Sequence, residues 1–74
     1  MGAGSEMVKE KWLQLVIDIV RERGCVTRRF IVDELQSLSI TQNQAERIAD
    51  ETLESLLKRG VIVRKGRGVY CWSP

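Results

Sequence analysis

The sequence lacks the residues on which most catalytic and metal sites depend. Its 74 residues contain no histidine, and the two cysteines lie far apart with no other ligand types near them. A zinc site cannot be assembled from one such chain, and neither can a catalytic triad built on histidine. We expect a protein that is not an enzyme, holds no metal or cofactor and has no evident small-molecule substrate.

Long hydrophobic runs are missing as well. A membrane-spanning helix needs roughly 18 consecutive apolar residues, but Asp18 interrupts the most apolar stretch, which runs from Trp12 to Val20. No signal-peptide pattern opens the chain. These absences predict a cytoplasmic protein that makes no contact with membranes.

The composition is that of a small folded protein. It is 43% hydrophobic and 30% charged, and it includes only one proline and six glycines, so neither a disordered chain nor a low-complexity linker fits. A chain of this length buries only about 60% of the surface that its unfolded form exposes, which leaves room for one core. We expect residues 1–4 to be disordered and residues 5–74 to form a single domain.

Positive charge is concentrated near the end of the chain. Residues 1–54 carry seven Lys and Arg against all ten Asp and Glu, whereas residues 55–74 carry five basic residues and no acid: Lys58, Arg59, Arg64, Lys65 and Arg67. Such local density attracts polyanions. A solvated turn after a helix is the alternative interpretation, but compensation of a helix dipole accounts for Lys58 and Arg59 and not for the other three.

Apolar residues at helical spacing predict a first helix from Ser5 to Arg23, with Gly24 as its C-terminal stop. Leu13 and Ile17 widen its apolar arc, so both can lie outside the core and leave room for a homodimer contact along this helix. The residues of the main stripe are Val8, Trp12, Leu15, Val16, Ile19 and Val20.

Two further helices follow a short extended segment at Cys25 and Val26. Thr27 can cap a second helix that ends near Ser37, with an apolar stripe of Phe30, Ile31, Leu35 and Leu38. Thr41 and Gln44 have the spacing of a capping box, and Ile40 can pack onto Ala45, so a third helix should begin at about Gln42 and end at Gly60. Its expected core face is Ala45, Ile48, Ala49, Leu53, Leu56 and Leu57.

The last segment predicts a β-hairpin with a basic tip. β-Branched and aromatic residues fill Val61–Arg64 and Val69–Trp72, and the sequence Lys-Gly-Arg-Gly at positions 65–68 separates the two runs. Ser73 and Pro74 should close the chain without further structure.

This order of elements resembles the winged helix-turn-helix superfamily, with MarR-like, ArsR-like and small archaeal-type regulators among its members. The resemblance covers residues 6–72 and rests on the segments VTRRFIVDEL, SITQNQAERIADETLESLLKRGVIVRKGRGVY and, within the latter, LLKRGVIVRKGRGVY. It implies an α+β winged helix-turn-helix: three helices with a small antiparallel sheet and a basic β-hairpin wing. One departure is a third helix about one turn longer than usual, and the extra length carries Asp50, Glu51 and Glu54.

In that superfamily the start of the third helix enters the major groove and the wing follows the DNA backbone. The resemblance therefore implies base contacts from the residues at Thr41, Gln42, Asn43, Gln44 and Arg47, a phosphate clamp at Arg28 and Arg29, and wing contacts from Arg64, Lys65 and Arg67. Asn and Gln pair with adenine and Arg with guanine. The alternative is that Thr41 and Gln44 only cap the helix and that the other residues are ordinary exposed side chains.

The resemblance also implies that the strand after the first helix pairs with the second wing strand, which would bring Cys25 and Cys71 together. A disulfide would help so small a core, whereas a cytosolic setting favours two free thiols. Both possibilities are open at this stage. Trp12 and Trp72 are expected to be packing residues rather than platforms for base stacking.

The predicted function is that of a protein that binds double-stranded DNA, a small transcriptional regulator acting as a homodimer through its first helix. The alternative is a protein-interaction module of a replication, transcription or membrane-remodelling complex, in which an acidic helix face is unproblematic. RNA binding, or the role of an accessory domain in a longer chain, is a third possibility.

Overall fold

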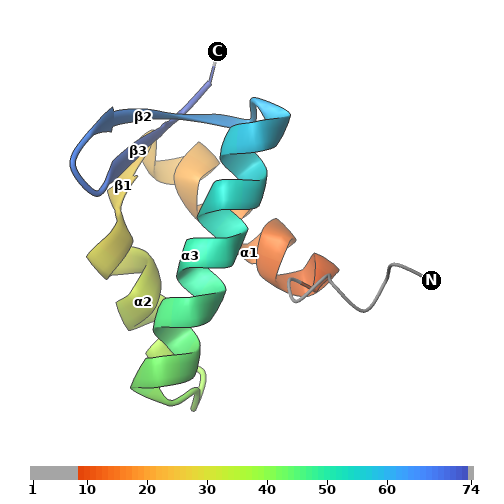
Figure 1. The fold of residues 1–74 in the computed structure, drawn as a ribbon, viewed down its shortest axis with the longest axis vertical. Coiled ribbons are helices and arrows are strands. Elements are labelled where there is room, and N and C mark those ends of the chain that lie inside the picture. Colours follow the sequence, from red (N-terminus) through yellow and green to blue (C-terminus); the bar gives the residue numbers. More distant parts are fainter. Residues whose placement is uncertain (1–8, 74) are drawn as a thin grey trace.

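Residues 9–73, the part of the chain that the computed structural model describes, form an α+β fold of three helices and one three-stranded antiparallel sheet (Figure 1). The expectations for residues 1–8 and for Pro74, including disorder at positions 1–4 and helix at Ser5 and Val8, lie outside the described residues. In chain order the elements are α1 (Glu10–Arg23), β1 (Cys25–Thr27), α2 (Arg28–Gln36), α3 (Gln42–Arg59), β2 (Ile62–Gly66) and β3 (Val69–Trp72).

Helix α1 contributes one face to the core. Leu13, Val16 and Val20 are buried, and the helix ends at Gly24, whose positive φ of 85° suits glycine. The expectation that Leu13 lies outside the core is wrong, because Leu13 shares a face with Val16 and Val20 and is only 4% exposed. Ile17 is half-buried and packs against the core from the flank of the same helix.

Helix α2 begins where the sequence predicted, since the Thr27 hydroxyl accepts a hydrogen bond from the backbone N–H of Phe30. Ile31, Val32 and Leu35 form its buried face. Leu38 was expected on this face, but α2 ends at Gln36, and Leu38 lies in the following turn with 51% of its surface exposed. That turn contains Ser39 in the left-handed backbone region, with a φ of 68°.

Helix α3 runs for 18 residues, a length of about 27 Å, and ends at Gly60 in the left-handed conformation. Four of its six expected core residues are buried, namely Ala45, Ala49, Leu53 and Leu56, while Ile48 and Leu57 are half-buried at the edges. The sequence did not predict that Thr52 is fully buried. Its hydroxyl has no hydrogen-bond partner among the described residues.

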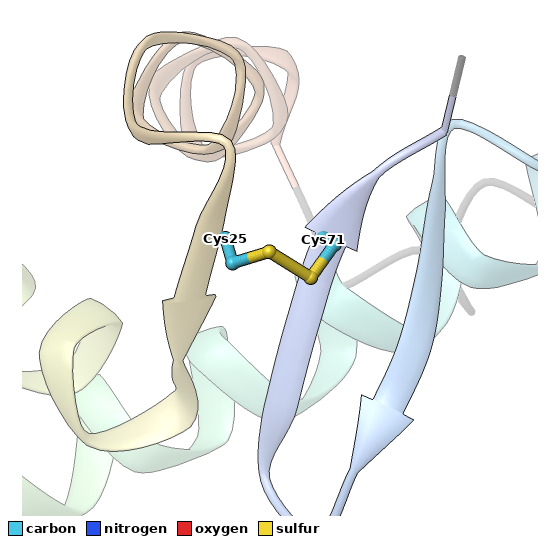
Figure 2. Close-up of a disulfide and its surroundings, with 2 residues drawn as sticks. All are labelled: Cys25 and Cys71. Atoms are coloured by element: carbon cyan, nitrogen blue, oxygen red, sulfur yellow. A yellow bond between two sulfur atoms is a disulfide. The ribbon is translucent and has the colours of Figure 1, made fainter.

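The sheet joins the short segment after α1 to the hairpin that follows α3. Strand β3 lies in the middle, so the strand order is β1-β3-β2, and Cys25, Val26 and Thr27 pair with Cys71, Tyr70 and Val69. The expectation that the two cysteines lie on neighbouring strands is confirmed. They form a disulfide, with Cα atoms 3.9 Å apart (Figure 2). The N–H of Trp72 donates to the carbonyl of Gly24, so the cysteines occupy the adjacent non-hydrogen-bonded position, where facing Cα atoms are closest.

The hairpin is longer and its turn tighter than the sequence suggested. Lys65 and Gly66 belong to β2, the strand pairing is irregular between Arg64 and Gly66, and only Arg67 and Gly68 form the turn. Gly68 has a φ of 69°, which a residue with a side chain rarely adopts. The irregularity is a β-bulge, which allows one extra residue in β2 and increases the local twist of the hairpin.

Both tryptophans pack against the core, as expected, and each is half-buried. Among residues 9–73, no helix is long and apolar enough to span a membrane.

The disulfide should contribute strongly to stability, because it closes a loop between positions 46 residues apart. A loop of that length corresponds to roughly 4 kcal/mol in the chain-entropy account, and loss of native disulfides from small domains costs about 2–5 kcal/mol. For a domain of this size we expect reduction to lower the melting temperature by at least about 10 °C. Thermal unfolding followed by circular dichroism, with and without reductant, measures this effect.

The double variant Cys25→Ser, Cys71→Ser is the control for this experiment. It should melt at the temperature of the reduced wild type and should not respond to reductant. An unchanged melting temperature of the wild type on full reduction would contradict the prediction.

Candidate functional site

A single backbone hydrogen bond ties the start of α2 to the turn of the hairpin. The N–H of Arg28 donates to the carbonyl of Gly68 over 2.8 Å, directly beyond the last pair of β1 and β3, Thr27 and Val69. The end of the sheet at which β1 leaves and the hairpin turns thus carries five basic residues, which we call the basic junction: Arg28, Arg29, Arg64, Lys65 and Arg67. All are exposed except Arg28, which is half-buried.

Arg28 makes a bidentate ion pair across the molecule. Its Nε donates to Oδ1 of Asp50 over 2.6 Å and its Nη2 donates to Oδ2 over 3.2 Å. The hydrogen bond to Asp50 raises the pKa of Arg28 by more than partial burial lowers it, so the guanidinium stays charged throughout the usual pH range. The side chains remain 37% and 59% exposed, so the pair contributes at most about 1 kcal/mol to stability.

This pair gives Arg28 and Asp50 contacts that the sequence did not predict. Arg28 was expected to hold phosphate, and Asp50 was noted as one of the acids that depart from the family pattern on the third helix. The structure places the carboxylate against the guanidinium instead. No local pattern could have revealed it, because the two residues are 22 positions apart and come from different helices.

The start of α3 presents exposed polar side chains at the other end of the molecule from the hairpin (Figure 1). The Thr41 hydroxyl accepts a hydrogen bond from the N–H of Gln44 over 3.4 Å, so Thr41 caps the helix as expected. In a full capping box the N–H of Thr41 would also donate to the side-chain oxygen of Gln44, but this bond is absent from the hydrogen bonds of residues 9–73. The Gln44 side chain is therefore left exposed to solvent.

Helical spacing puts Asn43, Arg47, Asp50 and Glu54 on one face of α3, and all four are exposed. The first half of this face carries an amide and a guanidinium, and the second half carries two carboxylates. Gln42 points elsewhere, since its amide donates to a carboxylate oxygen of Glu46 over 3.2 Å.

A polar cleft of about 480 Å³ is lined by residues of α2 and of the first half of α3. Its charged residues have both signs, because Arg28, Arg29 and Asp33 line it from α2 and Glu46 lines it from α3. Val32, Gln36 and Gln42 complete its lining. Of the residues expected to contact DNA, this cleft brings together Gln42, Arg28 and Arg29.

A second hollow of about 350 Å³ lies between the C-terminal half of α3 and the hairpin. Arg64 lines it together with Asp50 and Glu54, and Leu53, Leu57 and Tyr70 supply its apolar part. The carboxylates of α3 therefore separate the start of that helix from the cations of the hairpin. Sequence reasoning named Asp50 and Glu54 as a departure from the family pattern, but it did not assign them this position.

The expected site residues thus fall into two groups. Arg28, Arg29, Arg64, Lys65 and Arg67 form the basic junction, and Thr41, Gln42, Asn43, Gln44 and Arg47 occupy the first turns of α3. Arg64, Lys65 and Arg67 belong to the hairpin, at the other end of the molecule from the start of α3, whereas Arg28 and Arg29 line the same cleft as Gln42. A set of residues spread from the hairpin to the start of α3 suits contact with an extended partner better than enclosure of a small molecule.

Chemically, the surface can bind anions at the junction and make directional hydrogen bonds at the start of α3. Residues 9–73 contain no group of three or more His, Cys, Asp or Glu side chains placed to hold a metal ion. No known protein family, curated protein or solved structure shows a significant match to this chain.

The capping role of Thr41 can be separated from any role in binding. Because its hydroxyl satisfies a backbone N–H at the start of α3, Thr41→Ala should lower the free energy of unfolding by about 1 kcal/mol. Thr41→Ser should retain most of this stability, and Gln44→Ala should have little effect because its side chain makes no return bond. Urea unfolding of the three variants provides the measurement, and equal stability of Thr41→Ala and wild type would disprove the capping role.

Proposed function

We propose that this protein binds double-stranded DNA as a winged helix-turn-helix, acting as a small transcriptional regulator. The basic junction is the observation that carries the proposal. Its five cations come from two segments far apart in the sequence, and the hydrogen bond from Arg28 to Gly68 holds these segments together. A local concentration of cations from neighbouring segments is the electrostatic feature expected of a phosphate-binding protein.

The arrangement of the elements supports the same proposal. The order of helices and strands and the central position of β3 are compatible with a winged-helix layout in which the β2–β3 hairpin is the wing. The wing and Arg29 would then contact phosphates, and the exposed start of α3 would enter the major groove. Asn43 and Arg47 lie on the exposed face of that helix, and their side chains pair with adenine and guanine respectively.

The mixed charge of α3 favours a second candidate function, that of a protein-interaction module. Asp50 and Glu54 share the exposed face with Asn43 and Arg47, and carboxylates near a phosphate backbone oppose binding. The cleft between α2 and α3 also presents charges of both signs, which suits a polar peptide or protein surface. DNA binding is the better supported function because the basic junction carries more positive charge than these carboxylates offset.

A homodimer through α1 belongs to the same proposal. Leu13 is unavailable for it because it is buried, but Trp12, Leu15 and Ile19 recur along one flank of the helix and are each half-buried. A contact between two copies would cover this flank and produce a two-fold symmetric dimer that binds two half-sites of the DNA.

Salt dependence tests the phosphate contacts. Arg29, Arg64, Lys65 and Arg67 are free of ion pairs within residues 9–73, so about four phosphates should be neutralised per monomer. The logarithm of the affinity for random-sequence duplex should then fall against the logarithm of the salt concentration with a slope of about −4. Arg67→Ala should weaken binding to every sequence alike and should flatten the slope by about 1.

Asn43→Ala and Arg47→Ala are the contrasting variants. Each should cost roughly 1–3 kcal/mol on a sequence selected by the protein from a random pool, with little effect on random duplex. Fluorescence anisotropy at several salt concentrations measures both classes of variant. Absence of any salt-dependent duplex binding by the wild type would refute DNA binding and favour the protein-interaction module.

Sedimentation tests the dimer. The wild type should sediment as a dimer at tens of micromolar, and Leu15→Glu should shift it to the monomer because it puts a charge into the apolar flank of α1. A wild type that remains monomeric at this concentration would remove the dimer and, with it, the expectation of a palindromic site.

A further inference from the structure

The ion pair of Arg28 sets it apart from the other cations of the basic junction. Within the described residues, Arg28 is the one member of the junction that is bound to a carboxylate, and both oxygens of Asp50 are engaged. The pair bridges the beginning of α2 and the middle of α3. It therefore lies between the wing, which would hold phosphate, and the start of α3, which would read bases.

A guanidinium cannot be fully bidentate with two anions along the same edge. Arg28 uses its Nε and Nη2 for Asp50, and these are the atoms of one such edge, the geometry that also suits a phosphate. A phosphate that approached Arg28 would have to displace the carboxylate from this edge, or use the other edge, formed by Nη1 and Nη2, next to the negative charge of Asp50. The displaced Asp50 would remain beside the DNA as a repulsive charge.

We propose that Asp50 is an intramolecular competitor of DNA phosphate for Arg28, and that it thereby limits the sequence-independent affinity of the protein. This inference rests on the proposed DNA binding. It accounts for the carboxylate of Asp50 on α3, which would otherwise be unfavourable on a helix that enters the major groove. It also identifies a residue that regulates the strength of binding without contacting a base.

Replacement of Asp50 by the isosteric amide tests the competition. Asp50→Asn frees the charged edge of Arg28 for one more phosphate, so the salt slope on random duplex should become steeper by about 1. One added phosphate contact corresponds to roughly eight-fold tighter binding at 0.1 M salt, and the gain should vanish toward 1 M. Fluorescence anisotropy with the duplex used for the wild type measures both quantities.

Glu51→Gln is the matched control because it removes the same charge from the neighbouring position of the same helix. Within residues 9–73, Glu51 makes no ion pair. Its slope should remain that of the wild type. A gain from Glu51→Gln as large as that from Asp50→Asn would overturn the proposal, because it would show that net charge alone determines the effect.

A double-variant cycle isolates the contribution of Arg28. In an Arg28→Ala background, Asp50→Asn should no longer steepen the slope, since no guanidinium is left to release. An undiminished gain in that background would also overturn the proposal. Both variants should stay folded, because the pair is only partly buried and the backbone N–H of Arg28 keeps its bond to Gly68. Thermal melting checks this point.

NMR observes the ion pair between Arg28 and Asp50 directly, without measuring an affinity. In ¹⁵N NMR spectra the Nε–H resonance of Arg28 should differ between wild type and Asp50→Asn in the free protein, and in the wild type it should shift on addition of duplex.

If the wild type binds duplex and Asp50→Asn binds with the same salt slope, the proposed competition is wrong and DNA binding stands. If neither protein binds any duplex, the proposed function itself fails.

Discussion

The pairing of β1 with β3 is the constraint on which the rest of this structure depends. It joins residues 25–27 to residues 69–71, and the disulfide between Cys25 and Cys71, which are 46 positions apart, makes the connection covalent. A chain this small has little apolar surface to bury, so a cross-link that restricts its unfolded state has a large relative effect. The same pairing brings the N–H of Arg28 within hydrogen-bond distance of the carbonyl of Gly68, and this bond fixes the hairpin turn against the start of α2.

The distribution of charge follows from that constraint. The net charge of +2 conceals a surface on which cations collect at one end of the sheet while the carboxylates of α3 lie between them and the start of that helix. Asp50 occupies the boundary and is bound to Arg28. The electrostatic potential at this surface thus depends less on the number of charges than on which carboxylate neutralises which cation. Where one carboxylate neutralises one cation, a single substitution changes the local charge.

Much of the local structure could be predicted from the sequence because its causes are local. The caps at Thr27 and Thr41 and the stops at Gly24 and Gly60 were each identified from one residue and its near neighbours, and the structure confirms them. The errors occurred where packing overrides local pattern. The apolar arc of α1 is so wide that the sequence does not show which part of it faces the core, and Leu13 was therefore misplaced. Leu38 was misplaced because the apolar periodicity continues past the end of α2.

The sequence alone determined the three helices, the hairpin and the excess of cations in the last twenty residues, since periodicity, capping and composition act within a few residues of one another. Tertiary structure alone decided that Arg28 is held by Asp50, that Thr52 is buried and that the α2–α3 cleft carries charges of both signs. Each of these depends on how whole helices are oriented relative to one another and to the rest of the domain. That orientation is set by the shared core and the cross-linked sheet, and no pattern within a single segment contains it.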